Sequence, residues 1–318
     1  MESGRAGVTD LLGCCPAMQR LRRDIAQLGP SELRVHVFGE TGTGKEMVAK
    51  ALHAASPRAR RRLVPVNVAG FPDELLVAEL FGHARGAFTG AVGAREGYVA
   101  EAEGSTLFVD EVGDMSPLAQ VRLLRFLEGG EYRRLGETLA RRADVRLISA
   151  TNVDLARRVR EGRFRQDLWF RLNGEVISVP PLRERGGDVL LLARHFLHAH
   201  SARRGETPPS LSREVEAILL EHAWPGNVRE LESEMRRLGV RAASREVTVD
   251  DLSAPLRART SPRIGTLRAA LRQREAEIVR EALERHGGIL SRAAAELGIS
   301  RQSLWAKVRR LGLVGEGG

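Results

Sequence analysis

The chain has 318 residues and a formal net charge of +9, with 42% hydrophobic and 29% charged residues. This balance excludes a disordered chain and is typical of a globular protein large enough for two or three domains. No charged segment followed by an apolar run opens the sequence, and its apolar runs are too short to cross a bilayer, so we expect a cytoplasmic protein without a membrane partner. Cys14 and Cys15 are adjacent, which suits neither an ordinary disulfide nor a metal site.

The first half of the chain alternates between strand and helix patterns. An apolar run at 33–38 predicts a strand, GETGTGKE at 39–46 a glycine-rich loop, and the spacing that follows a helix. A second helix is expected to begin at Ser116 and Pro117 and to end at the glycines that follow it. Further strands are expected at 65–68, 105–111 and 144–152. This alternation predicts an α/β fold with a mostly parallel sheet covered by helices on both faces.

The second half of the chain is predicted to be helical. Residues 187–243 have the pattern of about three helices, and residues 254–265 have the Pro, Ser, Thr and Arg content of a linker. The last 64 residues hold 13 Arg and Lys against 6 Glu, so +7 of the +9 lies there. Such a concentration of positive charge indicates a nucleic-acid-binding unit, although a solvated basic face is an alternative.

GETGTGKE fits the pattern of a phosphate-binding loop (P-loop) between a strand and a helix. Its backbone N–H groups would surround phosphates, and Lys45 would reach the β and γ phosphates. Glu46 stands where Ser or Thr usually places a hydroxyl on Mg²⁺, so a purely structural turn remains an alternative. The candidate phosphate-binding residues are Gly39, Glu40, Thr41, Gly42, Thr43, Gly44, Lys45 and Glu46.

Two carboxylates end the predicted strand LFVDE at 107–111. A nucleotide hydrolase needs one group to hold the metal and another to orient water, roles that suit Asp110 as a Mg²⁺ ligand and Glu111 as the base. Many strands end in two acids without catalytic meaning, but this pair follows a P-loop at the spacing of a neighbouring strand. Asn152, at the end of ISATN, is a candidate sensor of the γ-phosphate or, alternatively, a helix cap. We therefore expect an ATP-hydrolysing site with Mg²⁺.

The segment 82–97 reads GHARGAFTGAVGAREG and sets one Phe among glycines and alanines. Leaving a buriable Phe in water forgoes roughly 1.5 to 3 kcal/mol, and glycine makes the backbone costly to order. Either a partner contacts Phe88, or Phe88 lies in the core of a buried turn.

Residues 289–313 have the pattern of a helix-turn-helix. Ala293, Ala294 and Leu297 form one apolar face, and Gly298 lies at the turn before a second amphipathic helix. A plain helical hairpin is the alternative. The second helix would present to DNA the side chains of Arg301, Gln302, Ser303, Lys307, Arg309 and Arg310.

The order and spacing of several motifs resemble a known family. GETGTGKE, ELFGHARGAFTGA, TLFVDEVGDM, GRFRQDLWFRLN, PPLRERGGD and WPGNVREL occur in this order between residues 11 and 242. This pattern resembles the AAA+ domain of sigma-54-dependent transcriptional activators, the bacterial enhancer-binding proteins, and the basic tail resembles their Fis-type helix-turn-helix domain. The Glu after the P-loop lysine and the GAFTGA segment are highly specific to that family.

The resemblance implies a domain order. We expect a short segment at 1–10, an AAA+ α/β ATPase subdomain at 11–180, a helical lid at 181–252, a linker at 253–264 and a small all-α helix-turn-helix domain at 265–318.

The resemblance also assigns roles around the nucleotide. Asn67 corresponds to the residue that holds the catalytic Glu111 in check until the γ-phosphate and the target are engaged. Thr151 and Asn152 match the sensor between sheet and nucleotide, and Arg229 in WPGNVREL matches the lid arginine that contacts phosphate. From the residues alone, Asn67 is only a strand-end Asn.

Other implied roles concern partners. Arg165 and Arg171 match arginine fingers that reach the nucleotide of a neighbouring subunit, which implies a ring, for which we expect six subunits. Read alone, each favours a helix-surface ion pair. The implied function is ATP-dependent remodelling of the sigma-54 RNA polymerase closed complex by a protein bound to upstream double-stranded DNA. The sigma-54 contact would be made by Gly86, Ala87, Phe88, Thr89, Gly90 and Ala91.

Two other functions compete with this hypothesis. One is a DNA-binding regulator that keeps the AAA+ fold without hydrolysis, and the other is a DNA translocase or protein unfoldase. The intact GAFTGA, Lys45, Asp110 and Glu111 argue against the first, and the terminal DNA-reading helix argues against the second. Only about ten residues precede the match. A sensory domain does not fit there, so we expect control by a regulatory protein in trans or by the protein's own supply, unless the chain is trimmed.

Overall fold

The structure is a computed structural model that describes residues 11–88, 90–242, 245–257, 275, 278–283, 285–287 and 289–310, without the side chains of residues 306, 309 and 310. The chain divides into two compact units, Met1–Leu256 and Arg257–Gly318. None of the described helices has the length and apolar character that crossing a bilayer requires.

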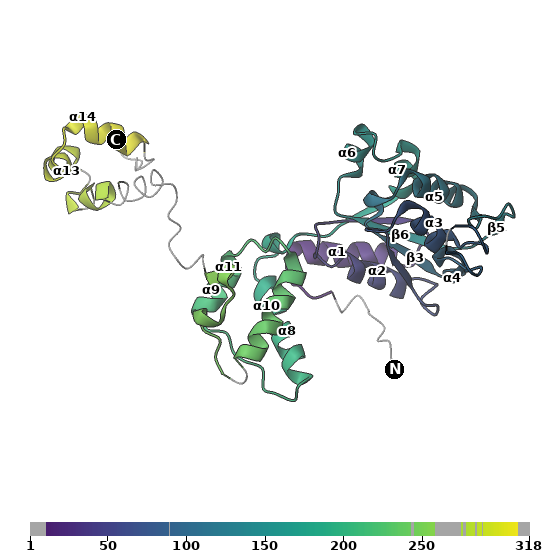
Figure 1. Ribbon diagram of the computed structural model, residues 1–318. Coiled ribbons are helices and arrows are strands. Elements are labelled where there is room, and N and C mark those ends of the chain that lie inside the picture. The colour runs from purple at the N-terminus through teal and green to yellow at the C-terminus, as the bar shows by residue number, and fades with distance from the viewer. Residues whose placement is uncertain are drawn as a thin grey trace. The chain divides into compact units, whose positions relative to one another are not determined.

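The first unit contains a five-stranded parallel sheet with the strand order β2-β3-β6-β1-β7. Figure 1 labels β3 and β6 of this sheet. The strands are β1 (Val35–Phe38), β2 (Val64–Asn67), β3 (Thr106–Asp110), β6 (Arg146–Thr151) and β7 (Glu175–Ser178). The predicted parallel sheet is confirmed, but β7 is an addition to it. On this edge strand only Ile177 is buried and Val176 is half exposed. The strand therefore carries little of the apolar alternation that would predict it from sequence. A short antiparallel hairpin of β4 (Glu131–Tyr132) and β5 (Arg141–Arg142) was also not predicted.

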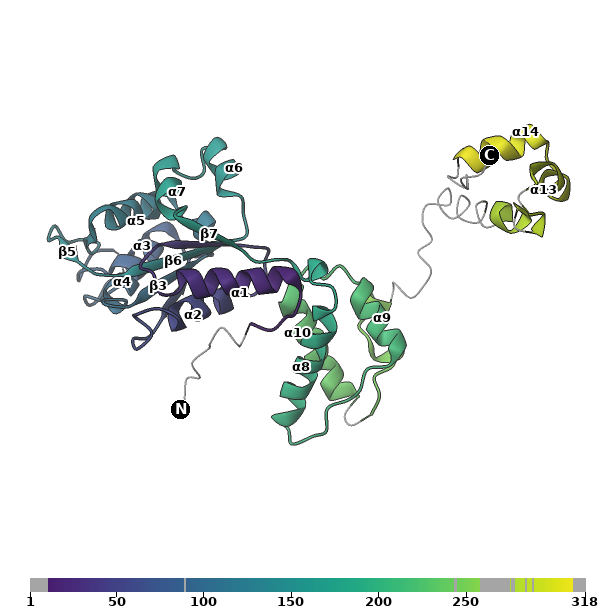
Figure 2. The same ribbon diagram turned by 180° about the vertical axis from the view of Figure 1, so that it is seen from behind.

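Helices cover both faces of the sheet. One face packs against α1 (Pro16–Leu28) and α2 (Lys45–Ala54), which lie together on the near side in Figure 2. The opposite face carries α3 (Asp73–Phe81) and α5 (Pro117–Gly129). Alternation along β3 sends Phe108 into the first core and its two neighbours into the second, as the twofold period of a strand requires. Shorter elements of this part are α4 (Tyr98–Glu101), η2 (Val112–Asp114), α6 (Leu155–Arg160) and α7 (Gln166–Leu172).

The helix predicted to begin at Ser116 has the expected caps. The Ser116 Oγ accepts the backbone N–H of Ala119 at 3.3 Å, which satisfies one of the free N–H groups of the first turn. Gly130 ends the helix with φ of 68°, a conformation that glycine adopts without strain.

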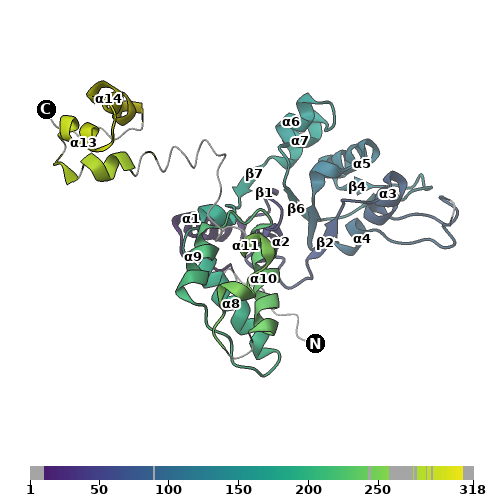
Figure 3. The ribbon, with the colours of Figure 1, turned by 60° about the vertical axis from the view of Figure 1, so that its left-hand side comes forward.

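The predicted helices of 187–243 are confirmed and form a separate core. They are α8 (Asp188–Ala202), α9 (Arg213–Glu221) and α10 (Asn227–Arg241), grouped together in Figure 3. The short elements η3 (Leu182–Glu184), η4 (Val249–Asp251) and α11 (Ala254–Arg257) flank them. Trp224 is fully buried at the centre of this core, and its indole N–H donates to the Leu219 carbonyl at 2.9 Å.

The second unit contains α13 (Leu290–Glu296) and α14 (Arg301–Arg310). Ala293, Ala294 and Leu304 are buried between them, and Gly298 has φ of 67° in the connecting turn. Because Ala293 and Ala294 are small, they allow the two helices to pack closely.

Candidate active site

The predicted nucleotide residues meet at one edge of the sheet. Because β1, β6 and β3 are parallel neighbours, their carboxyl ends open on the same side, where ligands of such sheets bind. A cavity of about 430 Å³ lies at this edge. Its lining includes Thr41, Gly42, Thr43, Gly44, Lys45, Glu46, Asn67, Asp110, Glu111 and Arg229.

The glycine-rich loop depends on two glycines. Gly42 and Gly44 have φ of 78° and 101°, in the left-handed region that side chains disfavour. A Cβ on Gly42 would lie 2.3 Å from the Gly226 carbonyl oxygen. Gly44 precedes α2, so the N–H groups at the start of this helix face the cavity end of the loop. This is an anion-binding arrangement.

Lys45 is a buried cation at the base of the loop, with a side chain only 6% exposed. Its Nζ donates to the Gly39 carbonyl at 3.0 Å and lies 3.4 Å from the Glu111 Oε1. A buried ammonium requires such partners, because its desolvation is expensive.

The two acids after β3 are held in different ways. Asp110 accepts the backbone N–H of Glu111 through Oδ1 at 3.0 Å. Glu111 has φ of 55°, unusual for a side-chain-bearing residue, and its Oε2 accepts the Asn152 N–H at 3.2 Å. Strain of this kind is common at functional sites. Glu111 is therefore fixed from two sides, by Asn152 and by Lys45.

The carboxylates at this site could bind Mg²⁺ only together with phosphate oxygens of a bound nucleotide. Asp110 lines the cavity and has the carboxylate that Mg²⁺ prefers. Among the described residues, no group of three or more His, Cys, Asp or Glu could hold a metal. Such a site suits Mg²⁺, which usually binds one or two carboxylates together with substrate phosphates. Glu46, at the irregular position of the loop, pairs with Lys50 at 2.8 Å on the surface of α2.

The polar residues at the neighbouring strand ends differ in whether they bond to the P-loop. Asn152 donates through Nδ2 to the Thr41 Oγ1 at 2.7 Å, and the Thr151 carbonyl accepts the Gly39 N–H at 3.2 Å. Asn67 instead accepts the Ala69 N–H at 2.9 Å. The hydrogen bonds of the described residues include none between Asn67 and Glu111.

The lid side of the site contains residues that the sequence did not reveal. Arg183 binds Glu40 through two hydrogen bonds, and the buried Asn227 contacts the same carboxylate. These contacts lower the pKa of Glu40 to about 2, chiefly through Arg183 and then Asn227. Arg183 lies in the PPLRERGGD motif, which was the only available signal. An apolar wall of the cavity was also missed: Leu11, Leu12, Met18, Val179, Phe196 and Val228.

Arg165 and Arg171 do not line this cavity. Arg165 forms a bidentate ion pair with Asp167, at 2.7 and 3.0 Å, which raises the pKa of Arg165 and lowers that of Asp167. Arg171 lies exposed in the last turn of α7. Any contact of these arginines with a nucleotide must therefore involve another subunit or a rearrangement.

The GAFTGA segment forms a hydrogen-bonded loop. Gly86 donates to the Ala91 carbonyl at 2.8 Å, and Ala91 donates to the Phe88 carbonyl at 3.0 Å. Phe88 is half-buried, with its ring edge-on to His83 at a centroid distance of 5.0 Å. The β4–β5 connection braces the base of the loop through Leu135, which bonds to Gly82 and Ala84. Thr89 lies outside the described residues.

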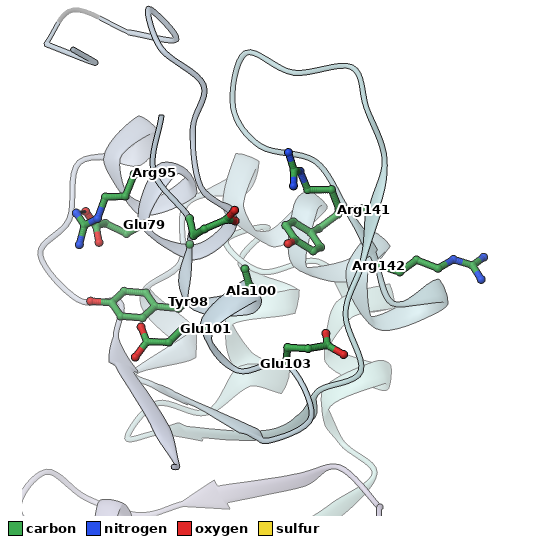
Figure 4. Close-up of a pocket in the computed structure, with 11 residues that line it drawn as sticks. Glu79, Arg95, Tyr98, Ala100, Glu101, Glu103, Arg141 and Arg142 are labelled. Carbon is green, nitrogen blue, oxygen red and sulfur yellow. Dashed lines mark hydrogen bonds and ion pairs between the residues drawn. The ribbon is translucent and has the colours of Figure 1, made fainter. Parts of the chain in front are cut away.

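A second hollow, of about 620 Å³, lies between α3, α4 and the β4–β5 hairpin (Figure 4). Arg95 and Glu79 lie against each other there, with an ion pair of 2.8 Å, whereas Arg142 points away from the other side chains. Its lining contains four Glu and three Arg, so its charges favour no single ligand class.

In the second unit, the predicted DNA-binding set lies on α14. Arg301, Gln302 and Ser303 are exposed. Lys307 forms an ion pair with Glu275. Trp305, which the sequence did not single out, is 54% exposed on the same helix. The side chains of Arg309 and Arg310 lie outside the described residues.

Three protein families match successive parts of the chain. Residues 11–178 match the sigma-54 interaction domain, residues 183–266 the AAA+ ATPase lid domain, and residues 270–311 the bacterial regulatory protein, Fis family.

Individual relatives match nearly the whole chain. The transcriptional regulatory protein ZraR of Salmonella typhimurium is 44% identical over 315 residues, covering 98% of this chain and 70% of ZraR. The DNA-binding transcriptional regulator NtrC of Escherichia coli is 42% identical over 331 residues, covering 96% of this chain and 71% of NtrC. A crystal structure of NtrX from Brucella abortus in complex with ADP has a TM-score of 0.77 at 34% identity, covering 96% of this chain and 70% of NtrX.

These matches agree with the P-loop, the acidic strand end, the helical lid and the terminal helix pair. The chain therefore belongs to the family of sigma-54-dependent transcriptional activators, with an AAA+ P-loop domain, a helical lid and a Fis-type helix-turn-helix.

Proposed function

We propose that this activator assembles into a ring, hydrolyses ATP with Mg²⁺ and uses the GAFTGA loop to remodel the sigma-54 RNA polymerase closed complex from upstream DNA. The observation that carries the proposal is the convergence of Lys45, Asp110 and Glu111 on a P-loop cavity, with Glu111 held by the Asn152 N–H, in a chain that also carries GAFTGA. NtrX, which resembles this chain, has been solved with ADP and with ATP, which supports the nucleotide assignment.

The proposed chemistry assigns a separate task to each charged group. Lys45 neutralises phosphate charge, and Glu111 accepts a proton from the attacking water. Bound Mg²⁺ would be held by Asp110 and would polarise the phosphoryl oxygens. Asn152 keeps the Glu111 carboxylate oriented through its backbone N–H and contacts the loop through its side chain.

A ring is proposed because the candidate arginine fingers do not line the cavity of their own subunit. The Arg165–Asp167 pair has both side chains about half exposed, at 47% and 48%. Ion pairs between exposed side chains contribute little to stability, so a triphosphate from a neighbouring subunit competes well for Arg165. We propose six subunits, with Arg165 and Arg171 acting on the adjacent nucleotide.

The GAFTGA loop is proposed as the sigma-54 contact because its Phe is neither deeply buried nor fully exposed. Phe88 is half-buried, with its ring against His83. Replacing this contact by contact with a partner surface would therefore cost little free energy. Positive φ at Gly86 and Gly90 gives the loop conformations that other residues disfavour.

Separate variants of the lysine and the base should separate binding from hydrolysis. Lys45→Ala should abolish ATP binding, since it removes the buried positive charge, whereas Glu111→Gln should keep ATP bound and slow hydrolysis by roughly a hundredfold or more. Titration with a fluorescent ATP analogue and a phosphate-release assay measure the two effects. Lys50→Ala, on the outer face of the same helix, should bind normally. Equal ATP affinity of wild type and Lys45→Ala would remove Lys45 from its role.

Mixing two inactive variants should test the shared site. Arg165→Ala retains its own Lys45 but lacks the finger, and should lose roughly a thousandfold in turnover. Lys45→Ala lacks nucleotide but retains the finger, so a mixture of the two should regain ATPase activity. Arg163→Ala, two residues away and more exposed, at 69% against 47%, is the control and should remain active. A mixture that stays as inactive as its components would contradict a site shared between subunits.

Truncation of Phe88 should separate partner contact from folding. A core Phe→Ala change costs about 3 to 5 kcal/mol, whereas half-buried Phe88 should lower the melting temperature only slightly. Phe88→Ala should therefore keep its fold and ATPase activity but lose binding to sigma-54 in the presence of ADP and aluminium fluoride. Val92→Ala shortens an apolar side chain that is 85% exposed next to the loop and should bind normally. A large fall in melting temperature, or normal sigma-54 binding by Phe88→Ala, would contradict the contact-loop proposal.

Substitutions on α14 should distinguish base readout from phosphate contact. Arg301→Ala should reduce discrimination between DNA sites, and Lys307→Ala should weaken all sites and flatten the log-affinity against log-salt slope by about 0.9. Because Glu275 competes for Lys307, Glu275→Gln should strengthen binding to all sequences. Fluorescence anisotropy at several salt concentrations measures these effects on the full chain. Salt-independent binding, or no change in any variant, would count against α14 as the DNA-reading helix.

A further inference from the structure

An ion pair connects the P-loop to the start of the lid. Glu40 is the second residue of the loop, and Arg183 lies in η3, 143 positions later. The two guanidinium nitrogens donate to the two carboxylate oxygens at 2.8 and 2.5 Å. Both side chains are nearly half exposed, at 43% and 44%, and an ion pair between exposed side chains contributes little to stability. Stability is therefore a poor reason for this contact.

A buried side-chain amide connects this ion pair by hydrogen bonds to the loop and to the lid. Asn227, fully buried at the first turn of α10, donates through Nδ2 to the Glu40 Oε2 at 3.2 Å and to the Thr41 carbonyl at 3.0 Å. Its Oδ1 accepts the Leu182 N–H at 2.8 Å. The residue has φ of 51°, a conformation that persists only where the surroundings determine it. One side chain thus connects the loop, η3 and the start of α10.

The start of α10 lies directly against the loop. The Arg229 backbone N–H donates to the Gly42 carbonyl at 3.3 Å, and any Cβ on Gly42 would collide with the Gly226 carbonyl. Arg229 follows Asn227 by two residues, and its side chain lines the nucleotide cavity. The contacts of Asn227 therefore determine where the Arg229 side chain begins relative to the phosphate-binding N–H groups.

We propose that Glu40 and Arg183 are a positioning pair that fixes the start of α10 against the P-loop, so that Arg229 meets bound phosphate in a reactive geometry. The inference rests on the proposed ATP hydrolysis. Neither residue of the pair needs to touch nucleotide, because both act through Asn227 and α10. The pKa of Glu40 is about 2, below its unfolded value, so the pair persists at ordinary assay pH and is lost only as pH falls toward 2.

A double-mutant cycle on the full chain tests the proposal. Glu40→Gln and Arg183→Met should each lower kcat about tenfold, within the hundredfold that a 1 Å misplacement costs, with little change in melting temperature. Because Arg229 is already displaced in Glu40→Gln, adding Arg229→Ala should cost much less there than in the wild type. If the fold losses of kcat in Glu40→Gln and Arg229→Ala instead multiply in the double variant, the proposal is overturned. Arg183→Lys keeps the charge without the bidentate geometry and should give an intermediate kcat.

A matched control and a second measurement complete the test. Glu216→Gln breaks the lid ion pair with Arg194, which is 2.7 Å long and remote from the loop, and should change kcat less than about twofold. Dissociation of a fluorescent ADP analogue should be severalfold faster from Glu40→Gln than from wild type, whether or not the wild type hydrolyses ATP. Absence of wild-type hydrolysis would refute the proposed function alone, whereas an unchanged dissociation rate would overturn the positioning pair.

Discussion

The buried ammonium of Lys45 is the constraint on which the first unit depends. A cation that is 6% exposed must have oxygen partners nearby, and the Gly39 carbonyl and the Glu111 carboxylate supply them. Glu111 comes from the end of β3, which is separated from β1 only by β6. The parallel strand order therefore does more than build a core. It places an acid, an Asn backbone N–H and a lysine at one edge, where their charges compensate one another and a triphosphate can compete for Lys45.

The opposite side of the same loop determines where the lid packs. Where backbone N–H groups converge on an anion, the carbonyl groups turn elsewhere and need donors of their own. The Thr41 carbonyl accepts from Asn227, and the Gly42 carbonyl accepts from the Arg229 backbone. The helical subdomain thus completes the hydrogen bonding of the P-loop. Movement of α10 changes these bonds and the position of Arg229 together, which is why an exposed pair at Glu40 has consequences beyond its small contribution to stability.

The parts of this site that the sequence predicted are those with local patterns. Strand, glycine loop and helix are contiguous, and Asp110 and Glu111 end an apolar run, so their types and spacing were sufficient. Contacts between distant segments leave no such pattern. Arg146 appears as a charged residue in a predicted strand, yet it is buried because its guanidinium donates to the Leu28, Gly29 and Leu33 carbonyls. The pairing of Glu40 with Arg183 and the edge strand β7 were missed for the same reason.

Two classes of functional group differ in how firmly the fold holds them. Glu111 has a strained backbone and two partners, as suits its proposed role as a base whose position relative to phosphate must not vary. Among the described residues, the Arg165 guanidinium pairs with the exposed Asp167, and the Phe88 ring lies edge-on to His83. Local contacts of this kind are weak enough to exchange for a partner's phosphate or apolar surface. The fold therefore combines fixed groups at the sheet edge with exchangeable groups on its surface, which is the arrangement that the proposed coupling of hydrolysis to movement of another protein requires.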